Sequence, residues 1–218
     1  MRTILFAVTL LIGFQAQANC PNAFVDLSGN ATDIQVQACA AIERATPMFK
    51  ACGLRFTRSV TVEVIDRMPP GFEEFIGVYH VTNENIAVLS PRALFESPIA
   101  MRQYPGLSAK ALFDAVLTHE LAHAAVHQMH AGADISLSGR EYIAGAMQVA
   151  AMPEAGRTLF LASQNLPETV SPGYFNTFIL QVRPEKFAAL AYGHFAAPST
   201  GCGFVARILS GAVVLGER

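Results

Sequence analysis

The residues with the clearest chemical meaning form the run His119-Glu120-Leu121-Ala122-His123, an H-E-x-x-H motif in a segment that predicts a helix. Histidines at this spacing lie about 40° apart around a helix and about 6 Å apart along its axis, so both imidazoles can reach one metal ion. Zinc binds imidazole nitrogens at about 2.0–2.1 Å. Glu120 points about 100° away from His119, close enough to reach a water on the metal. The motif therefore predicts a zinc site with a general base beside it.

A catalytic zinc site needs a third protein ligand and one open position. His127 lies two helical turns beyond His119, about 12 Å along the axis, so it cannot bind the same ion on an unbroken helix. His127 and His130 are expected near the end of this helix, where a positive charge suits the helix dipole. Glu141, on the next predicted helix, is the predicted third ligand, and Asp134 is the alternative.

The HELAH motif at 119–123, followed by E-x-x-A at 141–144, resembles the gluzincins, the thermolysin-like zincin metallopeptidases. The resemblance is to small, minimal members that bacteria export, and it covers about residues 56–152 in element order. One position departs from the pattern. Thermolysin-type members carry an acidic residue four positions after the ligand glutamate, where this chain has Gly145. The residue that fixes the orientation of a metal ligand by a hydrogen bond must then stand at another position in the chain.

The resemblance implies a zinc-dependent peptidase that acts on a peptide or protein substrate. Zinc would be held by His119, His123 and Glu141, and Glu120 would activate the zinc-bound water for attack on the peptide bond. Asp134 would be the third ligand if the site were of the aspzincin kind. Two other interpretations stay open: a zincin-like hydrolase or metal-binding protein without proteolytic activity, and a small secreted structural domain in which HELAH is accidental.

Gluzincins usually add a tyrosine or histidine that stabilises the oxyanion formed during hydrolysis. The resemblance therefore implies such a residue in the C-terminal part of the chain. Tyr192 and His194 are the main candidates and Tyr174 is a third. Each of them fits equally well as a packed aromatic ring or a solvated imidazole.

The elements that must position these residues follow in the order helix, strands, helices. Apolar periodicity, turn residues and prolines predict a helix at 33–51, strands at 58–66, 75–81 and 86–89, and helices at 108–129, 138–152, 154–165, 172–182 and 184–195, with an apolar element at 205–215. Segregated strands and helices indicate an α+β fold. By the resemblance, it is zincin-like, with a small mixed sheet and an edge hairpin packed on the active-site helix.

The predicted hairpin has a possible role of its own. Its two strands are joined by Thr82-Asn83-Glu84-Asn85, which is typical turn chemistry. In zincins an edge strand above the active-site helix binds an extended peptide by strand addition, and residues 77–81 would serve here. An internal strand of the sheet is the alternative interpretation.

The N-terminal residues predict export. Arg2, an apolar run over 4–14 and Ala16-Gln17-Ala18 form the pattern of a cleaved signal peptide at 1–18, leaving a single domain at 19–218 in the periplasm or outside the cell. The run is too short to cross a bilayer, which takes about 20 apolar residues. The whole chain is 52% hydrophobic and 15% charged with a formal net charge of −2, which excludes a disordered chain and a basic nucleic-acid binder. No stable membrane insertion is expected after signal cleavage.

Four cysteines in an exported chain indicate disulfides. Cys39 and Cys52 would lie about 20 Å apart along one helix, whereas bridged Cα atoms lie within about 7 Å. That pair is therefore disfavoured. The preferred pairing is Cys20–Cys39 with Cys52–Cys202, and the remaining pairing stays open.

Overall fold

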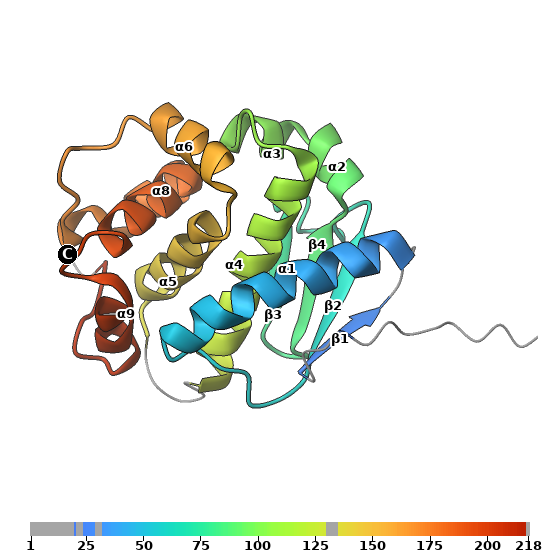
Figure 1. Ribbon diagram of the computed structural model, residues 1–218, viewed down its shortest axis with the longest axis horizontal. Helices are drawn as coiled ribbons and strands as arrows, with labels where there is room; N and C mark the ends of the chain where they lie inside the picture. The colour runs from blue at the N-terminus through green and yellow to red at the C-terminus, as the bar shows by residue number, and fades with distance from the viewer. Residues whose placement is uncertain (1–19, 21–23, 29–31, 130–134, 217–218) are drawn as a thin grey trace, which may run out of the picture.

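The computed structural model of the protein describes residues 20, 24–28, 32–129 and 135–216 (Figure 1). The predicted signal peptide, His130 and Asp134 lie outside these residues. The first half of the described chain holds the strands and the first helices: β1 (Val25–Ser28), α1 (Thr32–Ala51), β2 (Val60–Ile65), β3 (Gly77–His80), β4 (Asn85–Leu89), α2 (Pro91–Glu96) and α3 (Pro98–Gln103). The second half is helical: α4 (Ala109–Met129), α5 (Leu137–Ala150), α6 (Glu154–Ser163), a 3-10 turn (Pro172–Tyr174), α7 (Thr177–Val182), α8 (Pro184–Phe195) and α9 (Gly201–Leu209).

The four described strands form one mixed sheet in the order β1-β2-β4-β3. β1 runs parallel to β2 and β2 parallel to β4, whereas β3 is antiparallel to β4 through the predicted hairpin. This arrangement confirms the α+β fold class. It also places β3 at an edge of the sheet, so among the described strands its second side has no partner.

Helix α4 lies between the sheet on one side and helices α5 and α8 on the other (Figure 1). It packs against β3 and β4 on one side and against α5 on the other, and α5 in turn packs against α8. Most of its side chains are buried, including polar Thr118 and Glu120. A helix enclosed on nearly all sides gives its buried polar groups a low-dielectric environment, where electrostatic interactions are strong.

Three segments differ from the sequence-based prediction. β1 was not predicted, because four residues carry too little alternation to be recognised as a strand. The connection at 90–107 holds two short helices, α2 and α3, whose starts are capped by the Ser90 and Ser97 side chains. The helix predicted at 172–182 is a 3-10 turn and α7, because Asn176 caps a new helix there.

The C-terminal apolar element is also shifted. Helix α9 begins at Gly201 and ends at Leu209, so only the first part of the segment predicted at 205–215 is helical.

None of the helices in the described ranges has both the length and the apolar character needed to cross a bilayer.

Two disulfides join Cys20 to Cys39 and Cys52 to Cys202, with Cα–Cα distances of 5.2 and 4.5 Å. The preferred pairing is therefore confirmed. Helix α1 continues through Pro47 to Ala51, which keeps Cys39 and Cys52 apart as expected. The second bridge ties the end of α1 to α9 across a sequence separation of 150 residues.

Candidate metal centre

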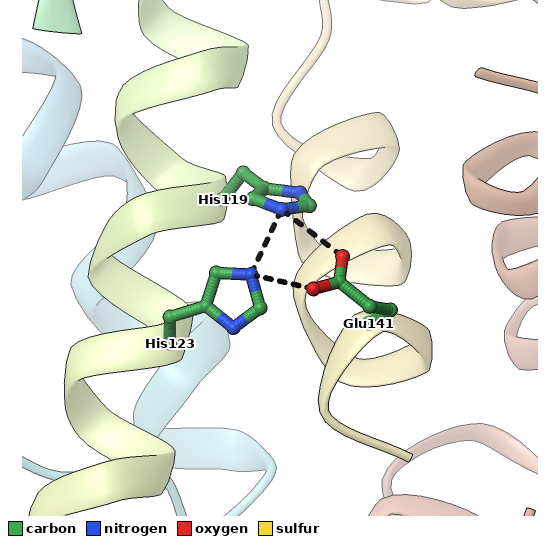
Figure 2. A group of neighbouring side chains, drawn as sticks. All are labelled: His119, His123 and Glu141. Carbon is green, nitrogen blue, oxygen red and sulfur yellow. Dashed lines mark hydrogen bonds and ion pairs between the residues drawn. The ribbon is translucent and has the colours of Figure 1, made fainter. Parts of the chain in front are cut away.

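Three predicted ligands converge between α4 and α5. Figure 2 shows His119 and His123 pointing from α4 toward Glu141 on α5. His119 Nε2 lies 3.0 Å from His123 Nε2, while the carboxylate oxygens of Glu141 lie 3.5 Å from His119 Nε2 and 3.4 Å from His123 Nε2. Figure 1 shows α5 lying beside α4, and the two helices pack closely. The packing of these helices brings the carboxylate to the two imidazoles.

The donor set and its spacing fit a tetrahedral zinc ion. Ligands at about 2.05 Å from a tetrahedral ion lie about 3.3 Å from one another. The three distances in the cluster fall close to this value. Two imidazole nitrogens and one carboxylate also form a ligand set of catalytic zinc sites, in which a fourth position is left for water or substrate.

The protonation states suit metal binding. Burial alone would raise the pKa of Glu141, but attraction by the two histidines lowers it to about 2, so the carboxylate is ionised. Burial lowers the pKa of His123 to about 4, so this ring is neutral near pH 7. Metal ligands must be deprotonated carboxylates and neutral imidazoles. Glu141 and His123 therefore need no proton release at neutral pH before they can bind an ion.

Glu120 lies beside the cluster but faces β3. Its side chain is 6% exposed, and burial raises its pKa to about 7. A Cβ built at Gly77 would lie 2.9 Å from Glu120 Oε1 and 2.7 Å from Val116. The absence of a side chain at Gly77 thus lets the edge strand pass directly over the carboxylate. A carboxylate with a pKa near neutrality is suited to take up and release a proton.

Sequence reasoning missed Gln148, which holds His119. The Nδ1–H of His119 donates to Gln148 Oε1 at 3.0 Å, and Gln148 Nε2 donates to the Tyr104 hydroxyl at 2.9 Å. The second bond orients the amide so that its oxygen faces the imidazole. His119 thereby keeps its proton on Nδ1 and directs Nε2 toward the cluster. Burial alone would lower the pKa of this ring, but the contact with Glu141 and the charge of Glu120 raise it, so binding of an ion must displace the proton from Nε2. Hydrogen bonds of this kind fix the tautomer and orientation of metal-ligating histidines.

The packing of α5 explains why the partner is Gln148. Gly145 is the position at which thermolysin-type members carry an acid. A Cβ there would lie only 2.9 Å from the Cα of Ala188 on α8, so no side chain fits. Gln148 lies two helical turns after Glu141, on the same face of α5. The two-turn spacing between Glu141 and Gln148 is the sequence signal that could have identified Gln148.

A cavity of about 780 Å³ opens over the cluster. Residues of β3, α4, α5 and α7 line it, together with the segment before β3 and the start of α8. His119, Glu120, His123 and Glu141 all contribute to its wall. The cavity is large enough for part of a peptide, since small-molecule sites span about 300–1,000 Å³.

The predicted oxyanion residues lie elsewhere. His194 is buried, its Nδ1 is 2.8 Å from the Tyr142 hydroxyl, and it packs against Phe175 and Phe204. The ring of Tyr192 packs under the guanidinium of Arg157. Among the described residues that line the cavity, neither these two side chains nor Tyr174 is present. The structure therefore does not bring the three candidates to the cluster of His119, His123 and Glu141.

The other histidine of α4 behaves as expected. His127 is outside the three-residue cluster, and its Nδ1 lies 2.9 Å from the hydroxyl of Tyr79 on β3. It lines the same cavity farther along the helix. The contact joins the end of α4 to the edge strand.

Comparisons with known proteins place the chain in a family without assigning it a function. No curated protein and no solved structure matches it. One family model matches residues 25–218, and its description is a family of unknown function, DUF6639. Because the match covers the four described strands, His119, His123 and Glu141, and α9, the chain belongs to the DUF6639 family.

Proposed function

We propose that this protein is an exported zinc-dependent peptidase of the gluzincin kind. The observation that carries the proposal is the convergence of His119, His123 and Glu141 next to the buried Glu120, under an edge strand. Bringing three partly buried polar side chains together beside the buried Glu120 costs free energy unless the groups serve one another or a ligand.

Each residue has a defined role in the proposed reaction. His119, His123 and Glu141 would hold zinc, which, when bound, supplies Lewis-acid activation of water and of the scissile carbonyl. Glu120 acts as the general base: its buried carboxylate lies beside the cluster, where it can take a proton from the attacking water and pass it to the leaving amine. Gln148 keeps the Nε2 of His119 free for the metal.

The edge strand β3 is the proposed binding site for the peptide backbone. The side of β3 that has no partner among the described strands lies against Glu120, as the close approach of Gly77 and the hydrogen bond from the Tyr79 backbone indicate. An extended peptide added along this edge would form main-chain hydrogen bonds with β3 and carry its own carbonyl groups past the base. Binding of this kind gives affinity with little dependence on side chains.

Export is part of the proposal. Two disulfides are typical of oxidising compartments, and the sequence pattern at 1–18 is typical of a signal peptide. The protein would then act in the periplasm or outside the cell on peptides or proteins present there.

The test is cleavage of a broad peptide mixture by the zinc-loaded protein, read by mass spectrometry, with Glu120→Gln as the matched variant. We expect the wild type to cleave and the variant to bind as much zinc but to lose at least about a hundredfold in rate, the usual contribution of a general base. Zinc binding without cleavage by the wild type would contradict the peptidase proposal and favour the non-proteolytic alternative. Equal cleavage by both proteins would remove Glu120 from the mechanism.

A further inference from the structure

Arg140 differs from the other residues around the cavity. It directly precedes Glu141 on α5, and it is the one arginine or lysine among the described residues that line the cavity. It is exposed, and its charge acts on both Glu141 and His123, so it lies within electrostatic reach of the metal-ligand cluster. A cation at the mouth of a reaction site can select the charge of what enters.

The guanidinium of Arg140 has no protein partner in the described ranges. By contrast, Arg44, Arg58, Arg92 and Arg183 each form an ion pair with a carboxylate. The nearest carboxylate in sequence, that of Glu141, is occupied by the two histidines. The side-chain donors of Arg140 therefore remain available to a ligand in the cavity.

Apolar and neutral polar side chains share the cavity with Arg140. Ile135, Leu137 and Leu180 line the same cavity and are apolar, while Gln181 adds a neutral polar group. Guanidinium presents a planar fork of N–H donors that matches a carboxylate in a bidentate fashion. Carboxylate is the anionic group that unmodified peptides carry.

We propose that Arg140 binds a carboxylate of the peptide substrate and thereby determines which peptides the site accepts. The carboxylate can be the free C-terminus of the peptide or the side chain of an Asp or Glu residue, and the experiment below separates these sources. The inference rests on the proposed function, because that function supplies the class of ligand, a peptide. Arg140 is a specificity residue in this account and takes no part in proton transfer.

The experiment measures peptide binding without turnover. Four pools of random octapeptides combine a free or amidated C-terminus with the presence or absence of Asp and Glu. Each pool is incubated with the zinc-supplemented Glu120→Gln protein, and retained peptides are counted by mass spectrometry after gel filtration. The same measurement is made on two double variants, in which Arg140→Gln or Arg140→Lys is combined with Glu120→Gln. Arg67→Gln serves as the matched control, because Arg67 is exposed but lies outside the cavity.

We expect one kind of carboxylate to raise retention about tenfold over the neutral pool, as a charge-assisted bidentate contact does. Arg140→Gln should abolish this preference, Arg140→Lys should keep part of it, and Arg67→Gln should leave it unchanged. Equal retention of all pools, or the same preference after Arg140→Gln, would overturn the inference. Cleavage by the wild type is scored separately, so carboxylate selection without cleavage refutes only the peptidase, and cleavage without selection refutes only the role of Arg140.

Discussion

Replacing Gln148 by Met tests whether the hydrogen bond to His119 matters for the metal. Methionine has a similar length and keeps the buried space filled, but it removes both the acceptor for His119 Nδ1–H and the donor to Tyr104. Gln148 is 3% exposed, so water cannot readily replace either bond. The imidazole then loses its fixed tautomer and orientation, and part of its population carries the proton on Nε2, where it blocks metal binding.

Loss of such a partner typically weakens metal binding by about 10- to 100-fold, or roughly 1.4–2.7 kcal/mol. The assay is zinc affinity by competition with a chelating dye at fixed pH, with thermal unfolding of the metal-free protein to check folding. Tyr104→Phe is the control: it removes only the outer hydrogen bond and should cost less than the Gln148→Met change. Wild-type zinc affinity in folded Gln148→Met would refute the reasoning about His119.

Three further predictions concern stability. Gly145→Ala should lower the free energy of unfolding by about 1–3 kcal/mol, because its Cβ would overlap the Ala188 backbone; an unchanged denaturant midpoint would contradict the close packing of α5 on α8. Removing the Cys52–Cys202 bridge by double alanine substitution should cost up to about 5 kcal/mol, given the 150-residue separation, and chemical denaturation measures it. Burial lowers the pKa of His194, so the unfolded chain takes up the proton more readily; stability should therefore fall as the pH drops below about 6.5, and less steeply in His194→Gln. Parallel pH profiles for the two proteins would show that His194 does not contribute.

The convergence of His119, His123 and Glu141 was predictable because its signal is local. H-E-x-x-H fixes the relative position of His119 and His123 on any α-helix, and Glu141 follows on the next helix at a distance that a simple turn can close. The disulfide pairing was predictable for a similar reason, since helix length alone keeps Cys39 from Cys52. Both inferences needed only helix geometry.

The residues that sequence reasoning misplaced depend on long-range packing. Which side of α8 meets α5 decides where Tyr192 and His194 point, and nothing local in that segment specifies it. Gln148 has a helical spacing from Glu141 that the sequence shows, but the reason for its role depends on packing: Gly145 lies against Ala188, which leaves no room for an acid there. Arg140 likewise gained meaning only when the structure placed it at the cavity wall, with no ion-pair partner among the described residues.

The central claim is that His119, His123 and Glu141 hold one zinc ion. X-ray absorption at the zinc edge, combined with metal analysis of the purified protein, tests it most directly. We predict one zinc per chain with two imidazole nitrogens and carboxylate oxygen at about 2.0–2.2 Å, and loss of the tightly bound ion in His123→Ala and Glu141→Ala. Absence of bound zinc, or a zinc ion whose ligands are unchanged in both variants, would contradict the account.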